Sequence, residues 1–329
     1  MTANPAASIR ARLKNHADAT GQDFQRVLDR YGLERLLYRV SASRHAARFV
    51  LKGALLFSTW HATPHRPTRD ADFLGYGPDD IASVEQWFRD IAEVADADGL
   101  VIDPATVRGS EIRLEQGYGG VRIVMHATLD GMRIKLQADI GFGDAVTPDP
   151  EEIVFPVLLD GMSQPRLRAY PRYTVIAEKL HAICVLGIAN SRMKDYFDLH
   201  VLIQDGDLDD STLAEAIRST FGRRKTPVPA TEPVGLTPAF ASDDQKIREW
   251  KAFLSRNRLD ANELDATVSA IAARLLPLLS GANDPARTRK VSPAHMQDRT
   301  PKPAATSGAR QERTTAPPRG SIRTPRTRP

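Results

Sequence analysis

The sequence lacks the features that mark secreted and membrane proteins. Cys184 is its one cysteine, so no disulfide can form within the chain, as is usual in reducing compartments. No run approaches the roughly 18 apolar residues that a membrane-spanning helix needs. The first residues include basic side chains but no apolar segment typical of a secretory signal. We therefore expect a cytoplasmic protein without a membrane partner, and the apolar flanks of Cys184 predict a buried, unreactive thiol.

Charge is unevenly distributed along the chain. The whole sequence of 329 residues has a net charge of +4, but residues 281–329 hold 11 Lys and Arg against 3 Asp and Glu, which leaves −4 for residues 1–280. The same terminal segment contains 8 prolines and no aromatic residue. It cannot bury enough apolar surface to offset the entropy of ordering it, so we predict a disordered basic tail. The basic pI therefore does not show that the folded part binds nucleic acid.

The pattern of apolar residues divides the rest of the chain into three segments. Residues 8–44 repeat apolar side chains at spacings of three and four, which predicts helix throughout an N-terminal segment, 1–44. Residues 45–170 mix short strand-like and helix-like stretches, whereas residues 171–280 are helical in pattern. We therefore expect an α+β fold, with a mixed sheet and helices in the core at 45–170 and a C-terminal helical domain at 171–280.

Within the core segment, the expected elements are short. Asp130 and Gly131 join two alternating runs, a sequence typical of a tight hairpin. The predicted strands are 49–51, 68–74, 120–129 and 132–142, and the predicted helices are 55–60 and 79–97. In the helical domain the predicted helices are 173–189, 194–204, 211–220, 243–256 and 262–279.

Three aspartates form a candidate metal site. Asp70 and Asp72 alternate on a predicted strand, so their side chains point to one face, together with Thr68. Two carboxylates this close repel each other, and a bound divalent cation relieves the repulsion. Asp139 lies between Ala138 and Ile140 on a later strand, where an uncompensated charge is costly. Oxygen ligands suit Mg²⁺, which predicts a Mg²⁺ site, although Asp-x-Asp by itself is also typical of a solvated strand edge.

Gly53 ends a short apolar strand 17 residues before Asp70. A glycine at a strand–helix junction lets the backbone approach a phosphate, and the start of a helix offers unpaired N–H groups to it. This order of elements resembles the nucleotidyltransferase fold of the polymerase-beta superfamily, in which a glycine turn, an Asp-x-Asp strand and a third aspartate follow one another. Where that fold has Gly-Ser, this sequence has Gly53 and Ala54, so the contact of a serine hydroxyl with phosphate would be missing.

The helical domain contributes further charged candidates. Lys179 falls within the apolar stripe of its helix, so it either extends to water or neutralises a triphosphate in the cleft. Asp195 and Asp198 share one face of the next helix, either as a charge pair at a helix start or with Asp195 orienting Lys179 or the substrate. His181 and His200 have no partner at the spacing of metal ligands, so we interpret both as structural or solvated.

Several segments together resemble the AbiEii/AbiGii family of nucleotidyltransferase toxins from type IV toxin–antitoxin systems. The resemblance extends over about residues 10–280 and rests on residues 49–56, 66–73, 178–182, 194–199, 221–229 and 250–253. It implies a Mg²⁺-dependent enzyme that transfers a nucleoside monophosphate from an NTP to the 3′ end of RNA. Mycobacterial relatives modify the acceptor end of tRNA, which blocks translation. The implied partners are the NTP, the RNA and a cognate antitoxin.

The family's functional residues map onto the matching positions of this sequence. By this resemblance Asp70 and Asp72 are the catalytic metal-binding pair, Lys179 is the catalytic lysine, and Asp195 is the catalytic acidic residue of the last motif. The matched segments also supply the candidate nucleotide-binding residues, which are Lys52, Gly53, Ala54, Arg66, Thr68 and Asp198.

Two other functions fit the same residues. A small-molecule nucleotidyltransferase of the antibiotic-modifying kind would use the same metal site on a different acceptor. A basic groove beside the site would favour RNA, whereas a closed acidic pocket would favour an aminoglycoside. A non-catalytic protein that binds nucleotide or RNA would keep the fold, but the presence of all three aspartates and Lys179 argues against it.

Overall fold

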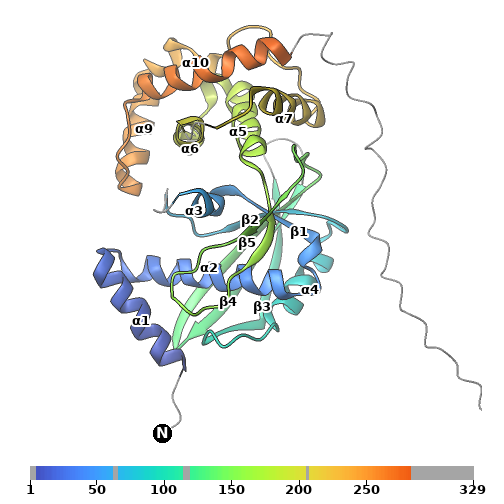
Figure 1. Ribbon diagram of the computed structural model, residues 1–329, viewed down its shortest axis with the longest axis vertical. Helices are drawn as coiled ribbons and strands as arrows, with labels where there is room; N and C mark the ends of the chain where they lie inside the picture. The colour runs from blue at the N-terminus through green and yellow to red at the C-terminus, as the bar shows by residue number, and fades with distance from the viewer. Residues whose placement is uncertain (1–4, 62–65, 114–118, 205–206, 283–329) are drawn as a thin grey trace, which may run out of the picture. The chain divides into compact units, whose positions relative to one another are not determined.

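The computed structural model describes residues 5–61, 66–113, 119–204 and 207–282, which belong to one compact unit (Figure 1). The tail predicted at residues 281–329 lies outside these ranges, apart from the two residues that end the last helix. In the described ranges, no helix is both long and apolar enough to cross a membrane.

A mixed sheet forms the centre of the fold. Among the described residues it has seven strands, in the order β3-β4-β5-β2-β1-β7-β6. Strand β2 runs parallel to β5 and β1 runs parallel to β7, whereas the other neighbours are antiparallel. This sheet, with helices packed on it, confirms the α+β class. The strands are β1 (Phe49–Lys52), β2 (Ala71–Gly75), β3 (Leu100–Arg113), β4 (Gly119–Leu129), β5 (Met132–Phe142), β6 (Glu151–Val154) and β7 (Arg166–Ala169).

The central strands follow the sequence pattern closely. The hairpin between β4 and β5 is confirmed, because its two turn residues, Asp130 and Gly131, both have positive φ, at 46° and 78°. The strand predicted at residues 68–74 begins only at Ala71. Asp70 therefore lies just before strand β2, and Asp72 lies within it. The side chains of β2 still alternate between the two faces of the sheet, because Ala71 and Phe73 are both buried.

Strand β3, at the edge of the sheet, is not predicted by the pattern, and neither are the short strands β6 and β7. Strand β3 contains Pro104, and its register with β4 shifts between Asp103 and Arg108. Such an irregularity breaks the period-two alternation on which a strand prediction depends. The strand is recognised only through its pairing with β4.

The predicted helices are present, with shifts of a few residues at their ends. The expected run at 8–44 is divided at Gly21, where φ is +64°, and Asp23 caps the second helix by accepting the backbone N–H of Arg26. The helices are α1 (Pro5–Thr20), α2 (Phe24–Ala42), α3 (Phe57–Trp60), α4 (Ile81–Ala92), α5 (Arg172–Leu186), α6 (Met193–Gln204), α7 (Asp210–Arg223), α8 (Pro238–Ala241), α9 (Asp244–Asn257) and α10 (Leu264–Ala282).

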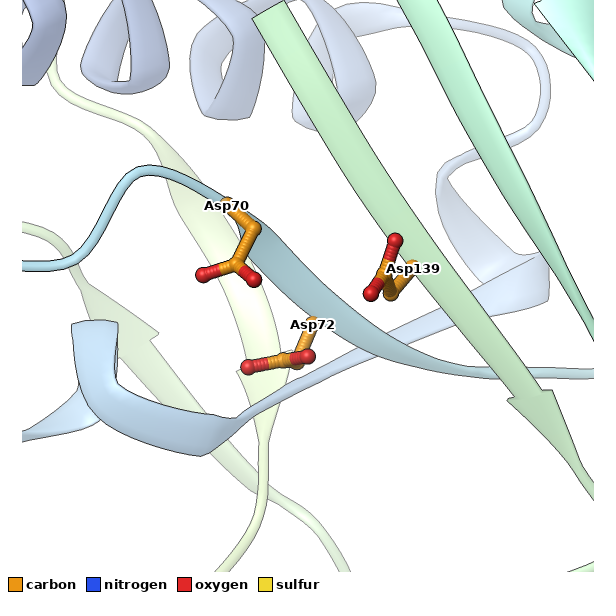
Figure 2. A group of neighbouring side chains, drawn as sticks. All are labelled: Asp70, Asp72 and Asp139. Carbon is orange, nitrogen blue, oxygen red and sulfur yellow. The ribbon is translucent and has the colours of Figure 1, made fainter. Parts of the chain in front are cut away.

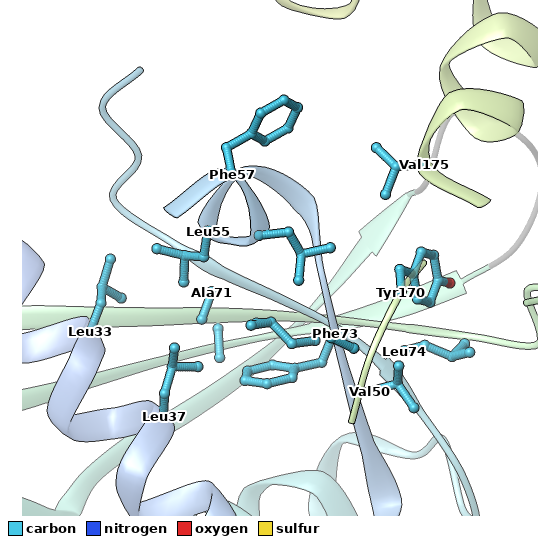
Figure 3. Packing of buried hydrophobic residues seen from close by; sticks show 14 of the residues in the cluster. Leu33, Leu37, Val50, Leu55, Phe57, Ala71, Phe73, Leu74, Tyr170 and Val175 are labelled. Atoms are coloured by element: carbon cyan, nitrogen blue, oxygen red, sulfur yellow. The ribbon is translucent and has the colours of Figure 1, made fainter. Parts of the chain in front are cut away.

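The main core lies between the sheet and helix α2. Leu33 and Leu37 of α2 point toward Ala71 and Phe73 of β2 (Figure 3), and all four side chains are buried. Because successive strand residues point to opposite faces, burial of Ala71 and Phe73 directs Asp72 to the other face of the sheet. Packing of the core therefore sets the direction of this carboxylate.

The other face of the sheet meets the helical part of the chain. Strand β7 ends at Ala169, α5 begins at Arg172, and helices α5, α6, α7 and α10 pack mainly on one another (Figure 1). Tyr170 and Val175, at the junction, are buried above β1 (Figure 3). The carboxylates of β2 and β5 consequently lie near side chains from α5 and α6.

Candidate active site

The three aspartates singled out in the sequence lie together. Asp72 and Asp139 are direct register partners on the parallel strands β2 and β5, and Asp70 precedes β2 by one residue (Figure 2). One carboxylate oxygen of each residue lies within 4.8 Å of those of the other two, and all three side chains are partly buried. Oxygen-only donors at this separation suit a divalent cation of the Mg²⁺ type.

Neighbouring side chains hold two of these carboxylates in place. Arg122, opposite Asp139 on β4, donates from Nε and Nη2 to the two carboxylate oxygens of Asp139, at 2.8 and 2.6 Å. The hydroxyl of Thr68 donates to Asp70 Oδ1 at 2.6 Å. Each carboxylate oxygen has a further lone pair, so these bonds orient the side chains and leave acceptor capacity for a cation. The residues present therefore fit a metal site.

Asp72 is the most strongly perturbed of the three. Burial, and then the negative charge of Asp70, raises the pKa of Asp72 to about 7, while the ammonium of Lys52 opposes the shift. Concentrated negative charge of this kind is relieved by a divalent cation, which favours the ionised carboxylate. The raised pKa of Asp72 therefore reflects a repulsion that a bound cation would relieve.

Position 53 requires glycine, because its backbone lies too close to Asp72 for a side chain. Its φ is +75°, and a Cβ atom built on it would lie 2.1 Å from Asp72 Oδ2. Residues Gly53–Leu56 form a 3₁₀ turn that continues into only four residues of α-helix, so the expected helix start is shorter than the pattern suggests. The glycine lets this turn pass directly over the carboxylate, next to the place proposed for the phosphates.

Gly53→Ala should disrupt the site more than the fold. We expect the free energy of unfolding to fall by about 1–2 kcal/mol because of positive φ, and the displaced Asp72 should lower nucleotidyl transfer roughly a hundredfold. Denaturant unfolding and a transfer assay would measure the two effects. Gly161→Ala is the matched control, because Gly161 has φ +82° but no atom within 4 Å of an added Cβ. Equal loss of transfer in both variants would contradict a special role for Gly53.

A pocket of about 220 Å³ opens beside Asp72, between the sheet and helices α5 to α7. Gly53 and Ala54 form part of its wall. Its acidic residues are Asp72, Asp144, Glu178 and Asp195. Its basic residues outnumber them and are Lys52, Arg66, Lys179, Arg192, Lys194 and Arg224. A basic wall next to a carboxylate cluster suits the polyphosphate of a nucleotide, which needs both cations and a metal. We call this cavity the site pocket.

Lys179 and its two aspartates form one side of the site pocket. Lys179 Nζ donates to Asp195 at 2.8 Å and to Asp198 at 2.7 Å. Arg66 donates to both oxygens of Asp198 at 2.9 and 3.0 Å, which ties the segment before β2 to helix α6. Burial opposes the charge of Lys179, but Asp195 and Asp198 raise its pKa above the ordinary value. An ammonium group has three donors, so one remains to face the pocket.

Lys52, a predicted residue of the site pocket, lies near three that the sequence did not single out, which are Asp144, Glu178 and Arg224. Lys52 Nζ pairs with Asp144 at 2.8 Å, and Arg224 Nη2 lies 3.1 Å from Glu178 and 3.5 Å from Asp144. Burial raises the pKa of Glu178. Glu178 could have been suspected, because it precedes Lys179 in a family-like segment. Asp144 and Arg224 have no local signal, since they come together from separate loops beside β5 and α7.

Of the other predicted site residues, Asp198 lies behind the site pocket, fully buried and bonded to Lys179 and Arg66. Thr68 lies on the Asp70 side of the carboxylates. Lys194 also lines the site pocket, and its charge opposes the raised pKa of Asp72. The structure therefore brings the predicted residues into one region, which consists of the carboxylate cluster and the adjoining site pocket.

His181 is a buried structural residue. Its Nε2 lies 2.7 Å from the hydroxyl of Thr226 and its Nδ1 lies 3.3 Å from Arg224. Burial, and then the charge of Arg224, lowers its pKa to about 4. His200 lies 3.0 Å from the side-chain amide of Gln204. Both environments agree with the structural interpretation made from the sequence.

The low pKa of His181 should make stability depend on pH. Between about pH 6.5 and pH 4 the unfolded chain binds a proton that folded His181 does not, so the free energy of unfolding falls as the pH falls through this window. Relative to His181→Gln, the wild type should lose up to about 3 kcal/mol at the acidic end. Urea unfolding of both proteins at several pH values would measure this difference. Parallel pH curves would show that His181 is protonated in the folded state.

Cys184 differs in part from its expected state. Cys184 is partly buried, whereas the sequence predicted a buried residue. Burial nevertheless raises its pKa to about 12. Because the thiolate is the reactive form, the thiol remains a poor nucleophile, as expected from its apolar neighbours.

Two crystal structures from Helicobacter pylori align with the chain. One, provisionally described as a nucleotidyltransferase, is 14% identical, has a TM-score of 0.43, and the alignment covers 78% of this chain and 96% of that one. The other, JHP933, is 13% identical with a TM-score of 0.45, and the alignment covers 80% and 96%. Similarities this low do not bear on function.

No curated protein matches the sequence. The family model described as nucleotidyl transferase AbiEii toxin, type IV TA system, matches residues 35–274. That range contains the three aspartates, the glycine turn, Lys179 and Asp195. Because the match spans most of the chain, the protein belongs to the AbiEii family of nucleotidyl transferase toxins of type IV toxin–antitoxin systems.

Proposed function

We propose that the protein is a Mg²⁺-dependent toxin that transfers a nucleoside monophosphate from an NTP to the 3′ end of RNA. The acceptor end of tRNA is the proposed target, and its modification would block translation. A cognate antitoxin is the proposed partner that silences the enzyme. The observation that carries the proposal is the cluster of Asp70, Asp72 and Asp139 at the edge of a basic site pocket.

The three aspartates and the charged residues of the site pocket have distinct proposed roles. Asp70, Asp72 and Asp139 would hold the metal. Lys52 and Lys179, which both line the site pocket, would bind and orient the triphosphate, because ammonium groups are compact cations with several donors. Asp195 and Asp198 would act through Lys179, which they hold in place at 2.8 and 2.7 Å. Arg224 is a second phosphate-binding candidate on the side of Lys52.

The proposed reaction is an in-line displacement at the α-phosphorus. The 3′ oxygen of the acceptor forms a new bond to this phosphorus, the bond between the α-phosphorus and the bridging oxygen of the β-phosphate breaks, and pyrophosphate leaves. The hydroxyl proton passes to solvent. A bound divalent cation would lower the pKa of the hydroxyl and neutralise phosphate charge. The protein's own contribution is to position both substrates and to provide cations at the leaving pyrophosphate.

Incubation with labelled NTPs, Mg²⁺ and total tRNA tests the proposal. Label should enter tRNA, should depend on Mg²⁺, and should be lost when the tRNA 3′ hydroxyl has been oxidised. Label in an aminoglycoside but not in tRNA would support the small-molecule alternative. Absence of any Mg²⁺-dependent nucleotide binding would support a non-catalytic protein. The basic wall of the site pocket favours the RNA reaction, because aminoglycosides are themselves cations.

A further inference from the structure

A second cavity, of about 640 Å³, lies next to the site pocket. The two cavities share Ala54 and Arg66. The second is lined by the turn between α1 and α2, part of α2, the segment before β2, and the end of α9. Its basic residues, which define what we call the arginine groove, are Arg26, Arg30, Arg66, Arg69, Arg256 and Arg258.

The arginine groove differs from the site pocket in the pairing of its cations. In the site pocket, Lys52, Lys179 and Arg224 all form ion pairs. In the groove, the described part of the chain provides no hydrogen bond or ion pair for the guanidinium groups of four arginines, which are Arg26, Arg30, Arg69 and Arg258. Cations gathered without acidic partners create a positive potential that attracts an anion.

The two acidic residues that line the groove form no ion pair with these arginines in the described part of the chain. Asp23 caps α2 by accepting the backbone N–H of Arg26, and Asp29 accepts from Gln25. Arg30 is partly buried, and burial lowers its pKa while Glu34 opposes the shift. Glu34 itself is bonded to Arg35 at 2.7 Å. A partly buried guanidinium without a close acceptor is costly, and a bound anion would remove that cost.

The groove and the site pocket adjoin the carboxylate cluster at different residues. Thr68 lines the groove, and its hydroxyl donates to Asp70. Asp72, in contrast, lines the site pocket. A nucleotide in the site pocket and an anion in the groove would therefore both lie next to the metal site, as a reaction between two substrates requires.

We propose that the arginine groove binds the phosphodiester backbone of the last nucleotides at the 3′ end of the acceptor RNA. The inference rests on the proposed function, for which it supplies the acceptor site. Guanidinium groups recognise phosphates through paired N–H donors, and several unpaired arginines along one groove match a chain that carries a phosphate at every residue. A free NTP would need only one such cluster, and the site pocket already provides it.

Variant Arg30→Gln/Arg258→Gln tests the groove by direct RNA binding. Fluorescence anisotropy would measure binding of a 5′-labelled single-stranded RNA, ending in a 3′ hydroxyl, over a series of salt concentrations. Loss of two phosphate contacts should weaken binding at least about tenfold, and it should reduce the slope of log K against log salt by about 1.4. Binding of ATP with Mg²⁺ in the absence of RNA should change less than about twofold, since neither arginine lines the site pocket.

Arg133→Gln/Arg166→Gln is the matched control. Both arginines are exposed. Arg133 lies on β5 and Arg166 on β7, and neither lines the groove. The control removes the same charge, so its RNA affinity and salt slope should stay within about twofold of the wild type. If Arg30→Gln impairs folding, Arg26→Gln/Arg258→Gln replaces it, because both of these side chains are exposed.

The outcomes separate the groove from the reaction. RNA affinity and salt slope unchanged in the groove variant would overturn the proposal, even if transfer to RNA occurs. Weakened RNA binding without any transfer by the wild type would support the groove and contradict the proposed function. A second ATP bound per wild-type chain, and lost in the variant, would assign the groove to a nucleotide. Competition by polyglutamate as strong as by RNA would also overturn the assignment to RNA.

Discussion

Asp70→Ala should reduce nucleotidyl transfer at least about a thousandfold, since metal-ion catalysis supplies several kcal/mol to the barrier. The midpoint of thermal unfolding should stay the same or rise slightly. Asp70 lies within 4.8 Å of two other carboxylates, and its charge contributes to the raised pKa of Asp72. Removing it relieves repulsion, which offsets the loss of the hydrogen bond from Thr68.

Two measurements distinguish a metal ligand from a structural residue. Mn²⁺ binding followed by electron paramagnetic resonance should weaken in Asp70→Ala, in parallel with the loss of transfer from labelled NTP. Glu215→Ala on α7 is the control, because Glu215 is exposed and does not line the site pocket. Full transfer by Asp70→Ala, or unfolding at a much lower temperature, would contradict the proposed role.

Lys179→Met should impair both catalysis and stability. Loss of the ammonium should lower transfer about a hundred- to a thousandfold, which is the typical effect of removing one group that stabilises developing charge. The free energy of unfolding should fall by about 3 kcal/mol, because Asp195 and Asp198 are almost fully buried and lose their shared cation. Urea unfolding and single-turnover transfer would measure the two effects separately.

A second substitution separates the two roles of Lys179. Lys179→Met/Asp195→Asn also removes one of the two buried negative charges that shared Lys179, so stability should recover by about 1–2 kcal/mol. Transfer should not recover, because the cation that faces the site pocket is still missing. If transfer recovers together with stability, Lys179 acts only by holding the helices together, and another cation must bind the triphosphate.

Short-range patterns in the sequence were sufficient for much of the local structure. The hairpin of β4 and β5 follows from Asp130 and Gly131, since few residue pairs accept two consecutive positive φ angles. The common direction of Asp70 and Asp72 follows from period-two alternation. The helices of the C-terminal part follow from apolar spacing, with errors of a few residues at their ends. Each of these features depends on residues close together in the chain.

Strand pairing and long-range ion pairs could not be obtained in this way. The register of Asp72 with Asp139 joins strands separated by many residues, and the ion pair of Arg66 with Asp198 spans 132 positions. Strand β3 is defined by its pairing with β4 and has no clean alternation of its own. Each of these contacts depends on a second segment that is distant in the sequence, so the pattern of one segment cannot predict it.

The amino-acid sequence thus determined the candidate chemistry: three aspartates, a glycine turn and a lysine, in an order typical of nucleotidyltransferases. Only the tertiary structure decided which side chains surround them. It placed Arg224 and Asp144 beside Lys52, and it gathered several arginines in a groove that also contains Thr68, the partner of Asp70. The physical reason is that local dihedral preferences act over a few residues, whereas a binding surface forms from segments that pack together only in the folded chain.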